Sequence, residues 1–521
     1  MLLASTAFLA LVISSQSATA NTVLNITLDP ELTAVTTSGI YTGFVDDAVP
    51  KVKQWLGIRY GKPPIGSKRF MPPEAAVDNM THYYAREYKP ICFQQSGDHT
   101  GLFWELVPEF QNQDPQGEDC LFLNIWAPKK PITKQVPVLI WVCGGGYREG
   151  GGHAPYQVPD HWLERMESHI LITFNYRLNV FGFPGARNAR ENAGFHDARL
   201  VYVSSTPMNL ARLTLVRSVE WARDNIGAFG GDPENMVIWG QSAGAGLVGS
   251  YIYANGEDPI VSGAIAMSGA AASSVPSNQT SFSELAEAAG CGGLSAGEEL
   301  SCMQSIPALR LQDLLRGSTL PGSNTSVPLF NPVFDNVTVF ANNTERLEKN
   351  LAADIPLITG HTTNEGAAFG AYISKNQTAP PPGFSGATGS FIACSVRAEI
   401  AQRLKYNLPT YRYLSGGNFS NITPRYWLGA MHSSDIPLVF GTHYLFRGNS
   451  SELEWETSYA MEISWISFSL DTSNDPTYAA GMKWPKYTAS GDTTLVFGRN
   501  DSAAQLLPGS YADSFFNCTG T

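Results

Sequence analysis

The sequence has little basic charge and only one extended apolar run, and both shortages exclude classes of protein. Its 34 lysine and arginine residues are outnumbered by 46 aspartate and glutamate residues, which gives a formal net charge of −12 at pH 7. An acidic balance of this size disfavours binding to nucleic acid or to an anionic membrane surface. The sequence also shows no basic tail, no internal repeat and no metal-ligand cluster, so we expect no metal site.

The extended apolar run lies at the N-terminus, where Leu2 to Ile13 precede the small-residue stretch Ala18-Thr19-Ala20. This order is typical of a signal peptide, so residues 1–20 are predicted to be removed after Ala20. No other run reaches the ~18 apolar residues that a membrane-spanning helix needs. We therefore expect a secreted, soluble protein without stable membrane insertion, in which residues 21–521 form one large domain.

Export is also indicated by the potential glycosylation sites and by the cysteines. Twelve Asn-x-Ser/Thr sequons occur along the chain, although sequons also arise by chance and predict nothing about occupancy at any one site. The seven cysteines fit an oxidising compartment, and their odd number means that they cannot all pair within one chain.

The pentapeptide Gly240-Gln241-Ser242-Ala243-Gly244 is the most informative feature of the sequence. It follows the apolar run 235–239 and opens a stretch of small residues, so it predicts a strand, a sharp turn and a helix. Such a turn holds the serine hydroxyl in a strained, projecting position, and glycines flank it because a Cβ would collide with the neighbouring strand or helix. An ordinary strand-to-helix turn is the alternative interpretation.

A second glycine cluster, Gly144-Gly145-Gly146, directly follows the apolar run Val136 to Val142. Three glycines leave the backbone N–H groups unshielded, which suits them to bind an oxyanion upstream of a nucleophilic serine. A flexible loop is the alternative. Found together, the two clusters favour acyl-transfer chemistry, which requires no cofactor.

Chain order restricts the base and the acid, because in this arrangement the carboxylate and then the histidine follow the serine. His361, His432 and His443 lie beyond Ser242, and His361 precedes the best acid candidate. We favour His432, which lies in a loop-like segment, over His443, which follows an apolar stretch and can simply pack.

The acid candidate is Glu365, which follows the short strand-like segment 355–360. Catalytic groups of open α/β sheets gather at the carboxyl edge of the strands. Glu365 is therefore preferred to Asp335, Asp354 and Glu399, which we interpret as solvated charges.

With these features the chain resembles the type-B carboxylesterase and cholinesterase-like branch of the α/β-hydrolases, particularly its secreted fungal members. The matching motifs run in order from about Gly57 to Pro485. They are Gly57-Ile58-Arg59-Tyr60-Gly61-Lys62-Pro63-Pro64, Glu118-Asp119-Cys120-Leu121-Phe122-Leu123-Asn124, Asn175-Tyr176-Arg177 and Phe229-Gly230-Gly231-Asp232-Pro233. The resemblance implies the α/β-hydrolase fold, with a mostly parallel central sheet flanked by helices.

The resemblance also implies roles for individual residues. Ser242, Glu365 and His432 would form the catalytic triad, and the backbone N–H groups of Gly145, Gly146 and Ala243 would form the oxyanion hole. By the same resemblance, Cys92 pairs with Cys120 and Cys291 with Cys302. The pairing of Cys143, Cys394 and Cys518 is left open. If Cys394 pairs with Cys518, Cys143 is free, and we interpret it as a buried, small apolar residue rather than a reactive thiol.

Two departures from the family pattern stand out. Residues 201–217 interrupt a segment that is normally continuous, and they are either a surface loop or a short intron read through in frame. The spacing between Glu365 and His432 is short, which indicates that part of the region covering the cleft is missing.

The substrate is the least determined part of the prediction. Gln241 stands where cholinesterases commonly carry glutamate, so choline esters are not favoured. Aromatic and aliphatic residues between Cys92 and Cys120, among them Phe103 and Phe110, line an acyl pocket, form a small interfacial lid or simply pack. We predict a carboxylesterase acting on a small-molecule or lipid ester. A lipase acting on acylglycerols at an interface and a non-catalytic binding protein are the alternatives.

Overall fold

The computed structural model describes most of the chain beyond its N-terminal segment. The described residues are 29–78, 80–95, 102–187, 189, 192–198, 218–271, 280–320, 326–369, 376–380, 386–491 and 493–518. The predicted signal peptide, residues 1–20, and the predicted insertion, residues 201–217, lie outside them.

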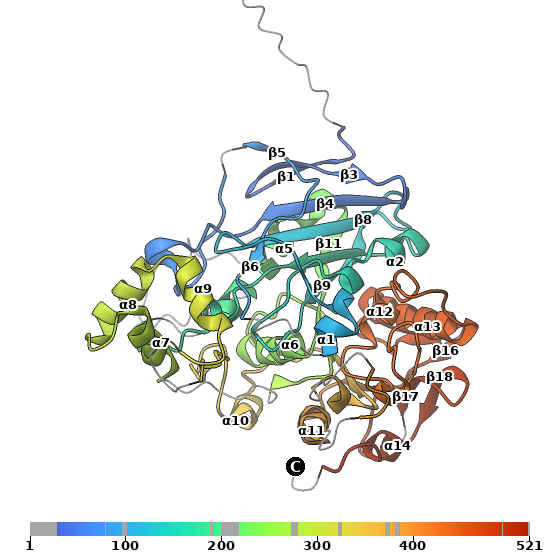
Figure 1. The fold of residues 1–521 in the computed structure, drawn as a ribbon. Coiled ribbons are helices and arrows are strands. Elements are labelled where there is room, and N and C mark those ends of the chain that lie inside the picture. Colours follow the sequence, from blue (N-terminus) through green and yellow to red (C-terminus); the bar gives the residue numbers. More distant parts are fainter. Residues whose placement is uncertain are drawn as a thin grey trace, which may run out of the picture.

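An eleven-stranded sheet runs through the centre of the protein (Figure 1). In spatial order its strands are β18 (Ser502–Leu507), β17 (Thr494–Arg499), β14 (Thr410–Ser415), β13 (Leu357–Thr362), β12 (Gly263–Met267), β11 (Gly231–Gln241), β9 (Val136–Val142), β10 (Ile170–Phe174), β8 (Phe122–Pro128), β4 (Val52–Arg59) and β3 (Phe44–Val45). The seven strands from β17 to β10 in this order are parallel to their neighbours, and the outer pairings are antiparallel. The predicted mostly parallel sheet is therefore present.

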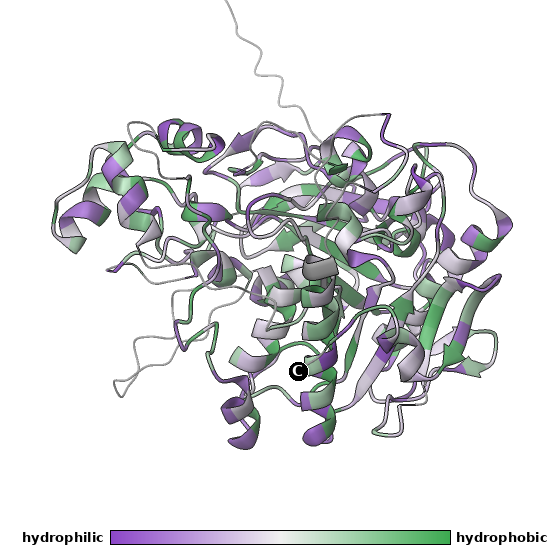
Figure 2. Cartoon of the chain, turned by 60° about the horizontal axis from the view of Figure 1, so that its bottom comes forward, coloured by the Kyte–Doolittle hydropathy of each residue, from purple (hydrophilic) through white to green (hydrophobic). Residues whose placement is uncertain are grey.

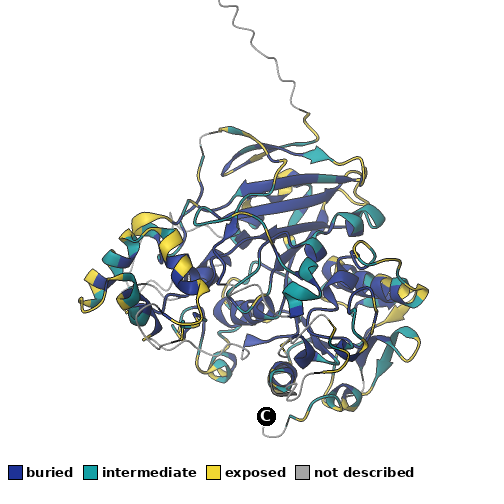
Figure 3. Cartoon of the chain, viewed as in Figure 1, coloured by how far each residue is buried: buried dark blue, intermediate teal, exposed yellow. Residues whose placement is uncertain are grey.

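Helices cover both faces of this sheet. Strands β9, β10, β12 and β13 are buried at every position, as expected for parallel strands with helices on both sides. Figure 3 shows the same burial along the central strands, with exposed residues on the outer helices. The helices of these two layers are α2 (Asp160–Arg165), α5 (Ser218–Asn225), α6 (Ala243–Ala254), α11 (Gly386–Lys405), α12 (Ile436–Val439) and α13 (Glu452–Leu470).

The side chains of β9 alternate between two hydrophobic cores, one on each face of the sheet. Val138 and Ile140 belong to a core cluster with residues of α5 and α6, whereas Leu139 and Trp141 belong to a second cluster with residues of α2, α12 and α13. Successive side chains of a strand point to opposite faces, so one strand contributes to both cores. In Figure 2 hydrophobic colour accordingly follows the inner elements, and hydrophilic colour gathers at the periphery.

Three further helices form a lobe at one side of the molecule, in yellow-green in Figure 1. They are α7 (Ser281–Ala289), α8 (Ala296–Ser305) and α9 (Ala308–Arg316). Their apolar residues, such as Phe282, Met303 and Leu311, form a separate core cluster. A small sheet of β1 (Thr33–Thr36), β2 (Gly39–Thr42) and β5 (His82–Tyr84) lies at the N-terminal end of the described chain. The remaining short helices are α1 (Leu102–Glu105), α3 (Asn179–Gly182), α4 (Ala193–Ala198), α10 (Asn343–Glu348) and α14 (Gly509–Asp513).

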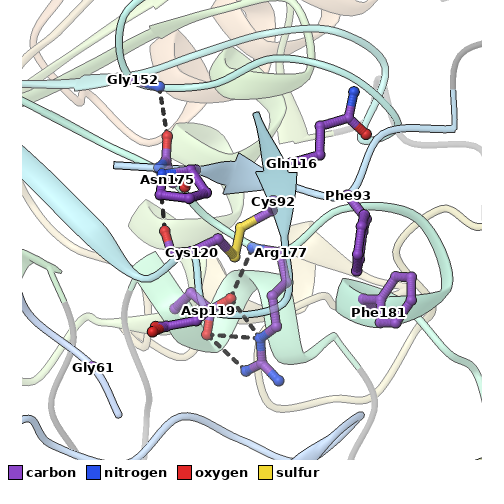
Figure 4. Close-up of a disulfide and its surroundings, with 12 residues drawn as sticks. Gly61, Cys92, Phe93, Gln116, Asp119, Cys120, Gly152, Asn175, Arg177 and Phe181 are labelled. Atoms are coloured by element: carbon purple, nitrogen blue, oxygen red, sulfur yellow. Dashed lines mark hydrogen bonds and ion pairs between the residues drawn. A yellow bond between two sulfur atoms is a disulfide. The ribbon is translucent and has the colours of Figure 1, made fainter. Parts of the chain in front are cut away.

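The structure forms both disulfides that the resemblance implies, Cys92–Cys120 and Cys291–Cys302, and it also pairs Cys394 with Cys518. Figure 4 shows the first of them beside Asn175, whose side-chain oxygen accepts the N–H of Gly152 at 2.8 Å and whose amide donates to the carbonyl of Cys120 at 3.2 Å. Asn175 therefore links the disulfide loop to the segment that follows the glycine cluster.

One sequence-based interpretation requires correction. Glu399 is a buried residue of α11, not a solvated charge, and it accepts the hydroxyl of Tyr253 at 2.8 Å. Asn421, one of the twelve sequons, is also buried, and its amide donates to the carbonyl of His443 and the hydroxyl of Ser450. An amide held in this way is not accessible for glycosylation.

Candidate active site

Ser242 lies at the turn between β11 and α6, with φ 59° and ψ −123°. Non-glycine residues rarely adopt this conformation, and such strain is typical of functional turns. A Cβ on Gly240 would lie 2.8 Å from the carbonyl oxygens of Val142 and Gly244, and a Cβ on Gly244 would lie 2.1 Å from that of Val142. The flanking glycines are therefore required by the close approach of β9, which is the geometry that the pentapeptide predicts.

The predicted oxyanion glycines follow β9, the strand that pairs directly with β11. Gly145 and Gly146 have φ values of 108° and 63°, which favour glycine. A Cβ on Gly144 would lie 3.0 Å from the Cβ of Ser242, so the loop passes directly beside the serine. Ala243 is the first residue of α6, where backbone N–H groups lack partners within the helix.

Glu365 begins the short helix η7 (Glu365–Phe369), three residues after β13, and it is fully buried. One carboxylate oxygen accepts the hydroxyl of Ser268 at 2.6 Å and the N–H of Thr362 at 2.7 Å. The other oxygen bonds Nδ1 of His432, so the structure brings the predicted acid and the predicted base into contact. Burial raises the pKa of Glu365, but the bonds from His432, Ser268 and Thr362 hold that pKa below its ordinary value.

The second ring nitrogen of His432 faces the pentapeptide. Its Nε2 lies 3.1 Å from the side-chain amide nitrogen of Gln241. Ser242 and His432 line the same cavity, but the structure forms no hydrogen bond between the Ser242 hydroxyl and His432. With Nδ1 donating to Glu365, Nε2 is the acceptor that the serine proton needs. A hydrogen bond between Ser242 and His432 therefore requires Gln241 to release Nε2.

A second buried carboxylate, Asp435, lies three residues after His432. One of its oxygens accepts the hydroxyl of Tyr413 at 3.0 Å, and the other has no hydrogen-bond partner. Burial and the neighbouring charge of Glu365 raise the pKa of Asp435 to about 7. The sequence does not predict Asp435, Ser268 and Gln241 as neighbours of Glu365 and His432. Only the closeness of Asp435 to His432 along the chain could have indicated one of these contacts.

The cavity at the serine has a volume of about 220 Å³. Phe103 of α1 and Phe110 of the short helix η2 (Pro108–Phe110) line it, with ring centroids 5.7 Å apart. Phe93, from the same disulfide loop, instead packs against Phe181. The apolar set between Cys92 and Cys120 therefore divides between lining the cavity and packing, which are two of the three interpretations that the sequence left open.

The two remaining candidates, His443 and Cys143, are both buried in the protein. His443 is fully buried, with Nδ1 at 2.6 Å from the hydroxyl of Ser450 and 3.4 Å from a carboxylate oxygen of Glu454, which fits a packing residue. Cys143 is a buried free thiol, and burial raises its pKa to about 12, so the reactive thiolate is disfavoured.

The described residues also show whether a metal site or a membrane-spanning helix is present. Among these residues, no group of three or more histidine, cysteine, aspartate or glutamate side chains is arranged to hold a metal ion. In the same part of the chain, no helix combines the length and apolar character needed to cross a bilayer.

The central sheet and the serine turn between β11 and α6 define an α/β-hydrolase. The chain belongs to the carboxylesterase family, whose model matches residues 31–381. It is 38% identical to chlorogenic acid esterase from Aspergillus niger over 92% of this chain and 93% of the relative. It is also 36% identical to secreted lipase 5 from Gibberella zeae, over 84% and 85% of the two chains.

A more distant relative, acetylcholinesterase from Electrophorus electricus, is 31% identical over 73% of this chain and 57% of the relative. The predicted fold class and the resemblance to fungal carboxylesterases are thus confirmed. The protein is a carboxylic ester hydrolase, so the non-catalytic alternative is not retained.

Proposed function

We propose that this protein is a secreted serine esterase that forms an acyl-enzyme on Ser242. His432 accepts the serine proton as the hydroxyl attacks the ester carbonyl, and Glu365 holds the ring in the required tautomer and stabilises its charged form. The N–H groups of Gly145, Gly146 and Ala243 bind the developing oxyanion, and one such donor typically contributes roughly 3 to 4 kcal/mol to transition-state stabilisation.

The buried bond between Glu365 and Nδ1 of His432 is the observation that carries this proposal. It leaves Nε2 at the cavity that Ser242 also lines, so one ring connects an ionised carboxylate to the site of the nucleophile. A histidine that served packing alone would not need a carboxylate on one nitrogen and a substrate-sized cavity at the other.

Ser242→Ala tests the nucleophile directly. We expect it to abolish hydrolysis of 4-nitrophenyl butyrate and labelling by a fluorophosphonate probe, which reports an activated serine. Ser250→Ala, a buried position two turns further along α6, is the matched control and should retain both. Turnover by Ser242→Ala at near the parent rate would overturn the assignment. An acylated Ser242 peptide, found by mass spectrometry after a rapid acid quench, would support the covalent step.

Secretion is part of the proposal because the relatives include a protein named as a secreted lipase and because three disulfides form. The N-terminal sequence of protein recovered from culture medium should begin at Asn21 if the predicted cleavage after Ala20 occurs.

Lipase activity is the second candidate, and Phe103 on the short helix α1 favours it by placing an apolar side chain at the cavity. A lipase with a mobile apolar cover should show a steep rise in rate when its ester substrate passes from solution to emulsion. An esterase should show no such rise.

A further inference from the structure

A positively charged side chain lies in the cavity beside the predicted oxyanion loop. Arg148 follows the glycine cluster by two residues and lines the same cavity as Ser242 and His432. A Cβ placed on Gly146 would lie 3.2 Å from a terminal nitrogen of the Arg148 guanidinium and 3.4 Å from its Nε. The guanidinium therefore extends over Gly146.

The backbone holds Arg148 in this place from both sides. Its N–H donates to the carbonyl of Gly145 at 3.1 Å, and its carbonyl accepts the N–H of Gln95 at 2.8 Å. These two bonds anchor the backbone of Arg148, so the position of its side chain relative to Ser242 is defined.

The guanidinium of Arg148 forms no hydrogen bond or ion pair with any residue in the described part of the chain. This distinguishes it from Arg69 and Arg177, which are bonded to Glu118 and Asp197 elsewhere in the structure. Among the described residues that line the cavity, Arg148 is the one permanent cation. Its hydrogen-bond donors are therefore available to a ligand.

The neighbouring carboxyl group, Glu149, does not neutralise this cation by a direct ion pair. Glu149 accepts a hydrogen bond from the side chain of Trp104, and one of its oxygens is buried without a partner. Burial raises the pKa of Glu149, although the charge of Arg148 and the bond from Trp104 oppose that rise. Arg148 therefore carries its positive charge in the cavity without a direct ion pair to Glu149.

We propose that Arg148 selects esters that carry a carboxylate on the part of the substrate that lies against the oxyanion loop. A planar guanidinium can donate two parallel hydrogen bonds to a carboxylate, and such bonds are strong where water is partly excluded. This inference rests on the proposed function, because that function places the ester carbonyl at Ser242.

Two matched pairs of esters test the inference. In the first pair, 3-acetoxybenzoate and its methyl ester, the carboxylate is on the leaving group. In the second pair, phenyl hydrogen adipate and methyl phenyl adipate, it is on the acyl group. The measured quantity is the ratio of kcat/KM for the anionic ester to kcat/KM for the neutral ester, taken for the parent protein and for each variant.

We expect Arg148→Gln to lower this ratio at least tenfold in one of the pairs, mainly through KM, and to leave hydrolysis of the neutral esters within about twofold. Arg148→Lys should lower the ratio less, because it keeps the charge but not the planar fork. Arg310→Gln, at an exposed position on α9, is the control for the change in net charge and should leave the ratio unchanged.

An unchanged ratio in both pairs would overturn the inference while the proposed function stands. If the parent protein cleaves none of the four esters, the proposed function itself fails. Should Arg148→Gln not fold, Glu149→Gln decides instead. Glu149 is the one carboxyl group among the described residues that line the cavity, so its removal should raise the ratio severalfold, and no change would contradict the inference.

Discussion

Glu365→Gln is the perturbation with the most definite consequence, because the surroundings of Glu365 determine how a glutamine would be oriented. The backbone N–H of Thr362 can only donate, so the oxygen of the amide must occupy the position beside Thr362 and Ser268. The amide nitrogen is then directed at Nδ1 of His432. An N–H group there turns Nδ1 into an acceptor and moves the ring proton to Nε2, where it prevents removal of the serine proton.

The expected loss follows from the wrong tautomer. In serine triads this change typically lowers kcat by about 10⁴, which corresponds to about 5 kcal/mol of transition-state stabilisation. We expect a loss of this order for 4-nitrophenyl butyrate, measured as steady-state kcat and KM, with KM little changed. Glu365→Asp, which keeps the charge, is the matched control and should lose less. A Glu365→Gln variant that is folded, as judged by circular dichroism, and retains a tenth or more of the parent kcat would refute the tautomer argument.

Two further substitutions examine the neighbours of His432. Gln241→Ala should raise the rate of fluorophosphonate labelling up to about tenfold, because it removes a hydrogen bond that competes with the serine for Nε2; a tenfold slower rate would contradict this. Asp435→Asn should change how stability depends on pH. Because folding raises the pKa of Asp435 to about 7, the folded state holds a proton that the unfolded chain releases, and the parent protein loses stability as pH rises from about 4 to about 7. The variant lacks this loss, so its stability relative to the parent should rise by about 2 to 3 kcal/mol between pH 5 and 7.5 in urea unfolding, and an equal difference at both pH values would exclude the effect.

The sequence predicts the serine turn and the strand before the glycine cluster well because their causes are local. The run Val136 to Val142 coincides with β9, and the glycines around Ser242 are needed wherever a strand turns sharply into a helix beside another strand. The strand expected at 355–360 is displaced and is observed as Leu357–Thr362. Strand ends depend on pairing with neighbours, here β12 and β14, which a local pattern does not contain.

The surroundings of the acid and base could not be predicted in the same way. Ser268 reaches Glu365 from the end of β12, and Tyr413 reaches Asp435 from β14. These contacts exist because adjacent parallel strands end at one edge of the sheet, and their partners are separated by 97 and 22 residues in sequence. Only the order of the strands in the sheet brings these residues together, and no periodicity of the sequence predicts that order.

Comparison of two buried glutamates shows why burial alone does not identify a catalytic acid. Glu365 and Glu399 are both buried, and burial raises the pKa of each. The pKa of Glu399 remains raised despite its contacts with Tyr253 and Arg403, whereas that of Glu365 ends below its ordinary value. The difference lies in the donors: Glu365 receives bonds from a hydroxyl, a backbone N–H and an imidazole, all directed at its ionised form. An ionised carboxylate is what stabilises an imidazolium, so the donors around Glu365, and not its depth in the protein, support the role that we propose for it.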